Sequence, residues 1–232
     1  MVIRQPILTW SWLRLAGATL ILVALVVQLT ASISAALANP TPHGGHLPTV
    51  LTNFFSYFTI LSNVSAAIAL LVAGGWGLRH ASDAVIEPLP IARLRACVAT
   101  YMITTGVVYN LLLRNAQVGI SAPWVNEVLH VAAPLLLLAD AFFAPGRRPL
   151  RWRVLVLIVA LPIAWIGYTL LRANHVVSPI TGDPWWYPYP FLDPHLVPGG
   201  YVGVAGYVAV VAVVIVGIGA GVVALSRWRG AG

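Results

Sequence analysis

The sequence predicts an all-α polytopic membrane protein, a bundle of six transmembrane helices with both termini in the cytoplasm. Three observations support this fold class. Hydrophobic residues make up 59% of the 232 residues and charged residues only 8%, and the mean hydropathy is +0.88. Six apolar stretches are each long enough to cross a bilayer, and the arginines alternate between the two sides of the membrane that these stretches define. Water-soluble domains do not have this composition.

The apolar stretches set the expected helices in order. A hydrocarbon core about 30 Å thick needs about 20 helical residues per crossing. The stretches cover residues 12–37, 50–75, 93–114, 122–144, 152–172 and 199–226. The first is longer than the core of a signal peptide, which has about 7–15 apolar residues, so we interpret it as a span although Ala36–Leu37–Ala38 could be a cleavage site.

The connections between the stretches are short, except for the last. Segments with Pro, Gly or charge lie at 39–42, 79–95, 115–123 and 145–148, and we expect turns there. The segment 173–200 is longer and rich in aromatic residues, so we expect it to be ordered at the membrane interface. No room remains for a second domain, and residues 1–232 are predicted to form a single membrane domain.

The arginines indicate the orientation. All 13 basic residues are arginines near the ends of apolar stretches, a distribution typical of membrane anchoring and not of nucleic-acid binding. On one side lie Arg4, Arg14, Arg79, Arg93, Arg95, Arg147, Arg148, Arg151, Arg153, Arg227 and Arg229. The other side holds only Arg114 and Arg172. Because cytoplasmic segments carry the excess of positive charge, both termini are predicted to lie in the cytoplasm of a cell-membrane protein.

Neither a cofactor nor a metal is expected. Cys97 is the single cysteine, which excludes an internal disulfide, a redox pair and a thiolate zinc site, and we interpret it as a packing residue. His43 and His46 lack a further metal ligand. His130 is the one histidine well inside a span, so paired axial ligands for a haem are missing.

Polar residues inside the spans are the informative ones, because each costs a few kcal/mol at bilayer depth unless it has a partner. Ser56, Thr59 and Asn63 share one face of the second stretch by their spacing. Taken singly, such residues often stabilise helix packing. In the predicted orientation, Thr59 and His130 lie about 12–14 Å below the outer surface at a rise of about 1.5 Å per residue.

Most of the other polar residues also fall in the outer half, and we predict that they form a polar cavity opening toward the outer leaflet. In the fourth stretch, Asn126 and Glu127 are close enough along the helix to face the same way as His130, either as structural partners or around a functional base. The third and fifth stretches add Asn110, Trp165, Tyr168 and Arg172. Asp140 lies near the inner end of its stretch, where Arg147 or Arg148 is its predicted ion-pair partner.

Three segments resemble the androgen-induced and androgen-dependent transmembrane hydrolase family. They are Phe55–Ser–Tyr–Phe–Thr–Ile–Leu–Ser–Asn63, Trp124–Val–Asn–Glu–Val–Leu–His–Val–Ala–Ala–Pro134 and Trp186–Tyr–Pro–Tyr–Pro–Phe–Leu–Asp–Pro194. Small uncharacterised bacterial membrane proteins look similar. Animal members are threonine hydrolases that cleave fatty acid esters of hydroxy fatty acids. The resemblance implies that Thr59 is the catalytic threonine and His130 the catalytic histidine, while the residues around Thr59 depart from the animal pattern.

These inferences together predict a lipid-ester hydrolase with membrane lipids as its partners. A threonine hydroxyl attacks an ester once a base within about 3 Å takes its proton. We expect His130 to be that base and Asn126 or Glu127 to orient it, while Asn63, Asn110 and Asn126 are candidate donors to the oxyanion. The aromatic connection is expected to anchor the chain at the interface and to cover the substrate, through Trp185, Trp186, Tyr187, Tyr189 and Asp193.

Two other functions stay open. In a small-solute transporter the same polar residues would line a path, but such a path needs polar residues in both halves and the inner half looks nearly bare. A non-catalytic scaffold or partner-binding protein would use Thr59 for stability or assembly only. The sequence does not specify the oligomeric state.

Overall fold

The computed structural model describes residues 4–81, 86–114 and 122–229, and within them the chain is all-α with no strand. Six of the described helices are long and apolar enough to cross a membrane, as predicted. The elements in order are α1 (Arg4–Ala38), α2 (Leu47–Ser56), α3 (Phe58–Arg79), α4 (Leu89–Val108), the π-helical turn η1 (Tyr109–Leu113), α5 (Pro123–Glu127), the π-helical turn η2 (Val128–Ala132), α6 (Ala133–Phe143), α7 (Val154–Ala173), the 3-10 turn η3 (Pro190–Leu192) and α8 (Tyr201–Arg229).

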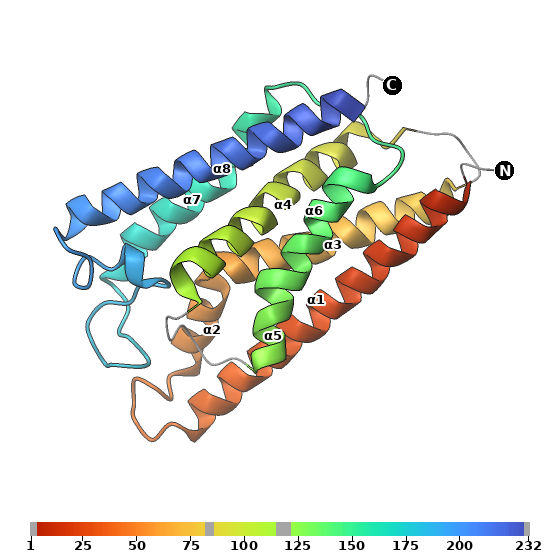
Figure 1. Cartoon of the computed structure of the whole chain (residues 1–232). Coiled ribbons are helices and arrows are strands. Elements are labelled where there is room, and N and C mark those ends of the chain that lie inside the picture. Colours follow the sequence, from red (N-terminus) through yellow and green to blue (C-terminus); the bar gives the residue numbers. More distant parts are fainter. Residues whose placement is uncertain (1–3, 82–85, 115–121, 230–232) are drawn as a thin grey trace.

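The observed spans agree closely with the predicted stretches. They cover Gln5–Ala38, Phe58–Arg79, Leu89–Leu113, Pro123–Phe143, Val154–Ala173 and Tyr201–Trp228. The start of α1 and the end of α8 lie at the same end of the bundle (Figure 1), as an even number of crossings requires. Most of the predicted turn at 115–123, and residues 82–85 of the turn at 79–95, lie outside the described residues.

The second stretch is interrupted, although it was predicted as one span over 50–75. Its helix breaks at Tyr57, whose backbone is extended (φ −68°, ψ 128°) between α2 and α3. No proline or glycine lies near the break, so local sequence does not explain it. Because α3 begins at Phe58, Thr59 is the second residue of the spanning helix and lies in its first turn, not well inside the span as a single helix over 50–75 predicted.

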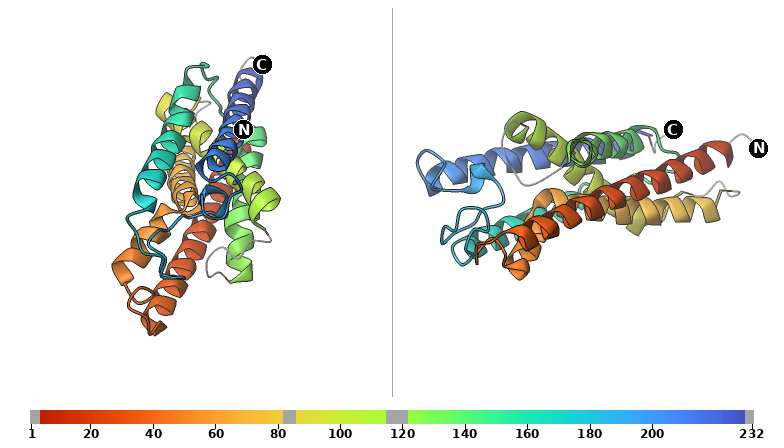
Figure 2. Two further views of the ribbon diagram at one scale, coloured as in Figure 1. Left: turned by 90° about the vertical axis from the view of Figure 1, so that its left-hand side faces the viewer. Right: turned by 90° about the horizontal axis from the view of Figure 1, so that it is seen from below.

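Helices α1 and α3 run side by side along much of their length (Figure 2). Small residues permit this close approach, because a Cβ added at Gly74 would meet the Ser11 carbonyl oxygen and Leu15 Cγ at 3.0 Å. On the other side of the bundle, α7 and α8 leave many apolar side chains exposed, as lipid-facing helices do. Helix α4 lies between these two sides of the bundle and contributes buried residues to the hydrophobic core on each.

Candidate functional site

A cavity of about 340 Å³ lies in the half of the bundle predicted to be the outer one, between α3 and α4 on one side and α7 and α8 on the other. Its walls are mostly aliphatic and aromatic. Three lining residues also face the outside, Ile163 of α7 and Ala212 and Val216 of α8, so the cavity opens between these helices toward the lipid. The other lining residues are Phe58, Thr59, Thr104, Thr105, Val108, Tyr109, Leu113, Val159, Pro162, Trp165, Ile166, Tyr189, Phe191, Leu192, Val208, Val211 and Ile215.

Thr59 supplies a buried hydroxyl to this wall. It stands in the first turn of α3, where backbone N–H groups have no partner inside the helix. The Thr59 N–H donates to the Tyr189 hydroxyl at 3.1 Å, and the two hydroxyl oxygens also lie 3.1 Å apart. Burial raises the pKa of Tyr189, so its hydroxyl stays protonated at neutral pH and can donate to Thr59 Oγ1 while accepting from the backbone.

Side chains of α7 hold the other side of the helix break. The Trp165 indole N–H donates to the Ser56 carbonyl at 2.8 Å, and the Tyr168 hydroxyl lies 2.9 Å from Ser56 Oγ. Tyr168 was predicted to belong to the polar cavity, but it does not line the cavity at Thr59 and is 43% exposed. Through its contact with Ser56, Tyr168 instead helps to stabilise the helix break.

Two threonines of α4 that sequence reasoning did not select also line the cavity. Thr105 Oγ1 lies 3.1 Å from Ser62 Oγ, which donates to the Thr59 carbonyl. The Thr104 hydroxyl is buried and has no hydrogen-bond partner within the described residues. The pair of adjacent threonines within an apolar stretch was the signal in the sequence that could have identified them. Neighbouring positions on a helix point in different directions, so the two hydroxyls cannot both face the same neighbouring helix.

His130 lies beside the cavity and not on its wall. Its Nδ1 is 3.0 Å from the Asn126 carbonyl, and its ring stacks on Tyr109 with centroids 3.9 Å apart. Tyr109 lines the cavity while His130 does not, so the tyrosine ring lies between His130 and the cavity. Within the described residues, no hydrogen bond joins Thr59 to His130.

The polar residues that were predicted to surround Thr59 and His130 form hydrogen bonds and ion pairs with other groups. Glu127 pairs with Arg114 at 3.1 Å near the surface instead of with His130. The Asn126 amide donates to the Tyr109 hydroxyl, and the Asn110 amide donates to the Gly106 carbonyl at 2.8 Å. Asn63 is fully buried and bridges the carbonyls of Thr59 and Leu129 at 2.9 and 3.2 Å. None of these three asparagines lines the cavity.

Only part of the aromatic connection covers the cavity. Tyr189, Phe191 and Leu192 close one end of it, and the Tyr189 and Phe191 rings are stacked with centroids 5.3 Å apart. The other predicted cover residues lie elsewhere. Trp186 packs on Tyr57, Trp185 stacks on His195, Tyr187 bonds to Tyr201, and Asp193 bonds to His195.

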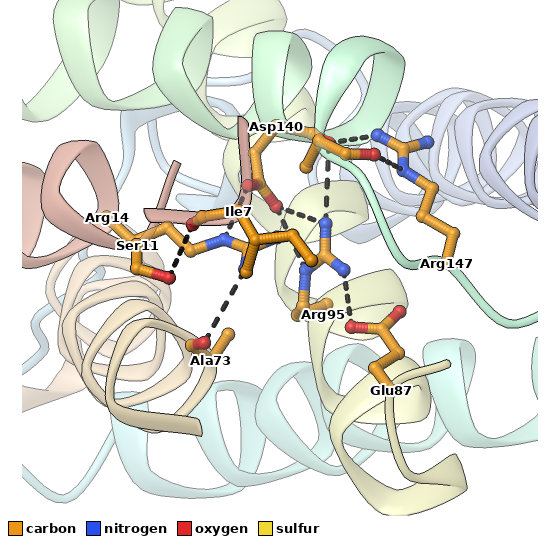
Figure 3. Close-up of polar contacts among 9 residues, drawn as sticks. Ile7, Ser11, Arg14, Ala73, Glu87, Arg95, Asp140 and Arg147 are labelled. Carbon is orange, nitrogen blue, oxygen red and sulfur yellow. Dashed lines mark hydrogen bonds and ion pairs between the residues drawn. The ribbon is translucent and has the colours of Figure 1, made fainter. Parts of the chain in front are cut away.

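A buried charged cluster occupies the opposite half of the bundle (Figure 3). The sequence had predicted almost no polar residues in that half. Asp140 of α6 is 3% exposed, and its carboxylate binds Arg14 Nε at 2.8 Å and Arg95 Nη2 at 2.5 Å. Arg95 also binds Glu87 at 2.5 Å. Arg147, a predicted partner of this carboxylate, donates to the Asp140 backbone carbonyl, and Arg148 donates to the Glu87 carbonyl.

This cluster stabilises the end of the bundle that is predicted to be the inner one. It joins α1, α4 and α6 to the segments that carry Glu87 and Arg147, and it borders a small cavity of about 40 Å³. Sequence spacing could not reveal the pairing, because Arg14 and Asp140 are 126 positions apart. The small cavity and the cavity at Thr59 share no lining residue.

Comparisons with protein-family models, with curated proteins and with solved structures find no match to this chain.

Proposed function

We propose that this protein is a cell-membrane hydrolase that cleaves lipid esters with Thr59 as the nucleophile. One observation carries the proposal: a buried hydroxyl stands on the wall of an apolar cavity that opens sideways between α7 and α8. An acyl chain entering from the bilayer would pack against the aliphatic wall, and its ester would meet Thr59. The three segments that resemble the transmembrane threonine hydrolases supply Thr59, His130 and Tyr189, which supports the same assignment.

The chemistry requires a base for the threonine proton. Thr59 Oγ1 attacks the ester carbonyl carbon while His130 Nε2 takes the hydroxyl proton. The bond to the alcohol oxygen then breaks, the alcohol leaves with that proton, and water releases the acid from the acyl-threonine. The Asn126 carbonyl accepts from His130 Nδ1, which leaves Nε2 as the basic nitrogen.

His130 reaches Thr59 only if the Tyr109 ring moves aside. The backbone offers a route to this motion, because Tyr109 begins the π-helical turn η1 and His130 lies within the π-helical turn η2. Such turns are uncommon and recur at functional sites. We therefore expect substrate entry to displace Tyr109 and to bring the imidazole against the threonine.

Hydroxyl groups of the cavity wall are the donors for the developing oxyanion. Asn63, Asn110 and Asn126 bond to other groups and do not line the cavity. Thr104 lines it with a hydroxyl that has no hydrogen-bond partner among the described residues. Tyr189 lines it next to the nucleophile, and its O–H can turn from Thr59 Oγ1 to the oxyanion once that oxygen has bonded to the carbonyl carbon. These two replace the asparagines as the proposed oxyanion donors.

The first test measures turnover of long-chain lipid esters by the purified protein in detergent, together with labelling by a fluorophosphonate probe. We expect Thr59→Ala to abolish both, and His130→Gln to lower turnover by about a hundredfold or more, as loss of a general base does. Thr19→Ala is the matched control, because Thr19 is exposed on α1 and bonds only to its own helix. Probe labelling that survives in Thr59→Ala would refute the nucleophile assignment.

A lipid-binding scaffold without catalysis is the second candidate. It is favoured by the position of His130 behind Tyr109 and by the role of the Thr59 N–H in fastening α3 to Tyr189. This function predicts that wild-type protein binds a lipid ester at the cavity without consuming it. Lipid recovered intact after prolonged incubation, with equal binding by wild type and His130→Gln, would favour the scaffold over the hydrolase.

A further inference from the structure

We infer that Arg172 and Asn53, with Ser56 holding the guanidinium in place, form a binding site for the phosphate group of a membrane phospholipid on the predicted outer face. The site lies on the α2 side of the helix break, and none of its three residues lines the cavity at Thr59. The inference is therefore independent of ester hydrolysis.

Arg172 is held in a fixed position with donors to spare. It stands in the last turn of α7, where its Nη2 donates to Asn53 Oδ1 at 2.6 Å and its Nη1 lies 3.4 Å from Ser56 Oγ. The guanidinium lies over the rings of Tyr168 and Trp186, 5.9 and 5.6 Å from their centroids. A guanidinium has five N–H donors, and these contacts use two of them.

The charge of Arg172 has no counter-ion among the described residues. Of the described carboxylates in the same half of the bundle, Glu127 pairs with Arg114 and Asp193 binds His195. Asp183 accepts from the Thr181 hydroxyl. A guanidinium at a membrane surface binds favourably to an anion that presents two oxygens to its N–H donors, as carboxylates and phosphates do.

Asn53 gives an independent indication of a ligand. It is 4% exposed, and its amide nitrogen is buried without a hydrogen-bond partner within the described residues. The oxygen of the same amide binds Arg172, so the unpartnered N–H group lies next to the guanidinium. A buried donor without an acceptor costs about 1–3 kcal/mol, and an anionic oxygen between the two side chains would satisfy both.

The position of the site identifies phosphate as the anion. The end of α7 and the aromatic rings of Tyr168 and Trp186 belong at the interface between hydrocarbon and head groups, where tyrosine and tryptophan concentrate. Phospholipid phosphates lie at this level of the bilayer. Inorganic phosphate presents the same oxygens, so the experiment separates the two sources.

Binding is measured by intrinsic tryptophan fluorescence, because Trp186 adjoins Arg172. Purified protein in detergent is titrated with phosphatidylglycerol, with diacylglycerol, which lacks the phosphate, and with inorganic phosphate. We expect phosphatidylglycerol to bind at least about tenfold more tightly than diacylglycerol, which can enter only the cavity at Thr59, and more tightly than inorganic phosphate. Arg172→Gln should remove this preference and Arg172→Lys should keep part of it, as loss of a charge-assisted contact predicts. Arg114→Gln is the matched control, because Arg114 is the other outer-face arginine and already has a carboxylate partner.

Several results would overturn the inference. Equal binding of diacylglycerol and phosphatidylglycerol by wild type would show that acyl chains alone are recognised. Tighter binding of inorganic phosphate would replace the lipid by a soluble ligand. Unchanged phosphatidylglycerol affinity in a folded Arg172→Gln protein would remove Arg172 from the site. The wild-type titrations decide the first two questions even if that variant does not fold.

Discussion

At the scale of single residues, the Tyr189 hydroxyl connects the fold to the candidate site. It accepts the Thr59 N–H that the helix break leaves free, and it also lies against Thr59 Oγ1. The group that stabilises the start of α3 therefore also fixes the position of the proposed nucleophile. Loss of this hydroxyl would disturb stability and site together, so variants of Tyr189 cannot separate the two.

Asp140 is the residue on which we expect stability to depend most. Replacing it by asparagine removes the negative charge that Arg14 and Arg95 share in the interior. Breaking a buried pair from one side costs about 3–5 kcal/mol, because it leaves buried charge without compensation. We expect Asp140→Asn to lower the free energy of unfolding by about that amount, measured by denaturant titration in detergent micelles.

Glu127→Gln serves as the control for this prediction. It also removes a carboxylate that pairs with an arginine, but the Glu127 side chain is 51% exposed. Exposed pairs contribute about 0–1 kcal/mol, so stability should hardly change. Equal effects of the two substitutions would mean that burial of the Asp140 cluster does not determine its contribution.

At the scale of elements, the sequence was sufficient for the spans and insufficient for the break. Hydropathy and arginine positions predicted all six spanning helices, because each depends only on local composition. The break at Tyr57 depends on Trp165 and Tyr189, which bind the freed backbone groups from 109 and 130 positions away. No proline or glycine near Tyr57 signals the break, so a single span was the natural prediction.

The candidate site was predictable to a similar degree. Thr59 and Tyr189 were both selected from the sequence, and the structure brings them into contact. Of the two residues expected to orient His130, Asn126 contacts its Nδ1 through the backbone carbonyl, whereas Glu127 pairs with Arg114. Spacing along a helix does not reveal Arg114 as a competing partner from another helix. Whether His130 acts on Thr59 stays a prediction.

The contact between α1 and α3 allows a test of how closely these helices must pack. An added Cβ at Gly74 would meet α1 backbone and Leu15 at 3.0 Å, whereas a Cβ at the neighbouring Gly75 meets nothing within 4 Å. Overpacking typically costs about 1–3 kcal/mol. We expect Gly74→Ala to destabilise the protein by that amount in the same denaturant assay.

Gly75→Ala gains the same helix propensity without the clash, so it should leave stability unchanged or raise it by up to about 1 kcal/mol. The two glycines are adjacent on one helix, which makes the pair a control for any effect on helix formation itself. Similar unfolding curves for both variants would show that α1 can shift at little cost.

At the scale of the whole molecule, polar groups occupy both halves of the bundle, but among the described residues the two cavities that they border are separate. The cavity at Thr59 and the small cavity at the Asp140 cluster have no lining residue in common. In the inner half, the carboxylates of Asp140 and Glu87 are already paired with arginines. The arrangement favours a site entered from the lipid over a path that crosses the membrane.

The orientation of the molecule follows from the arginine distribution and can be tested directly. Cytoplasmic segments of membrane proteins hold the excess of arginine, so the end that carries Arg147 and the termini should face the cytoplasm. Cys97 is the single cysteine, and a Cys97→Ala background permits site-specific labelling. Ile180 is 74% exposed in the aromatic connection and Pro149 is exposed at the opposite end. A membrane-impermeant maleimide applied to intact cells should modify the Ile180→Cys variant and should modify Pro149→Cys only after permeabilisation. The reverse pattern would place Thr59 and Arg172 on the cytoplasmic side, and the lipid leaflet proposed to supply both ligands would change with them.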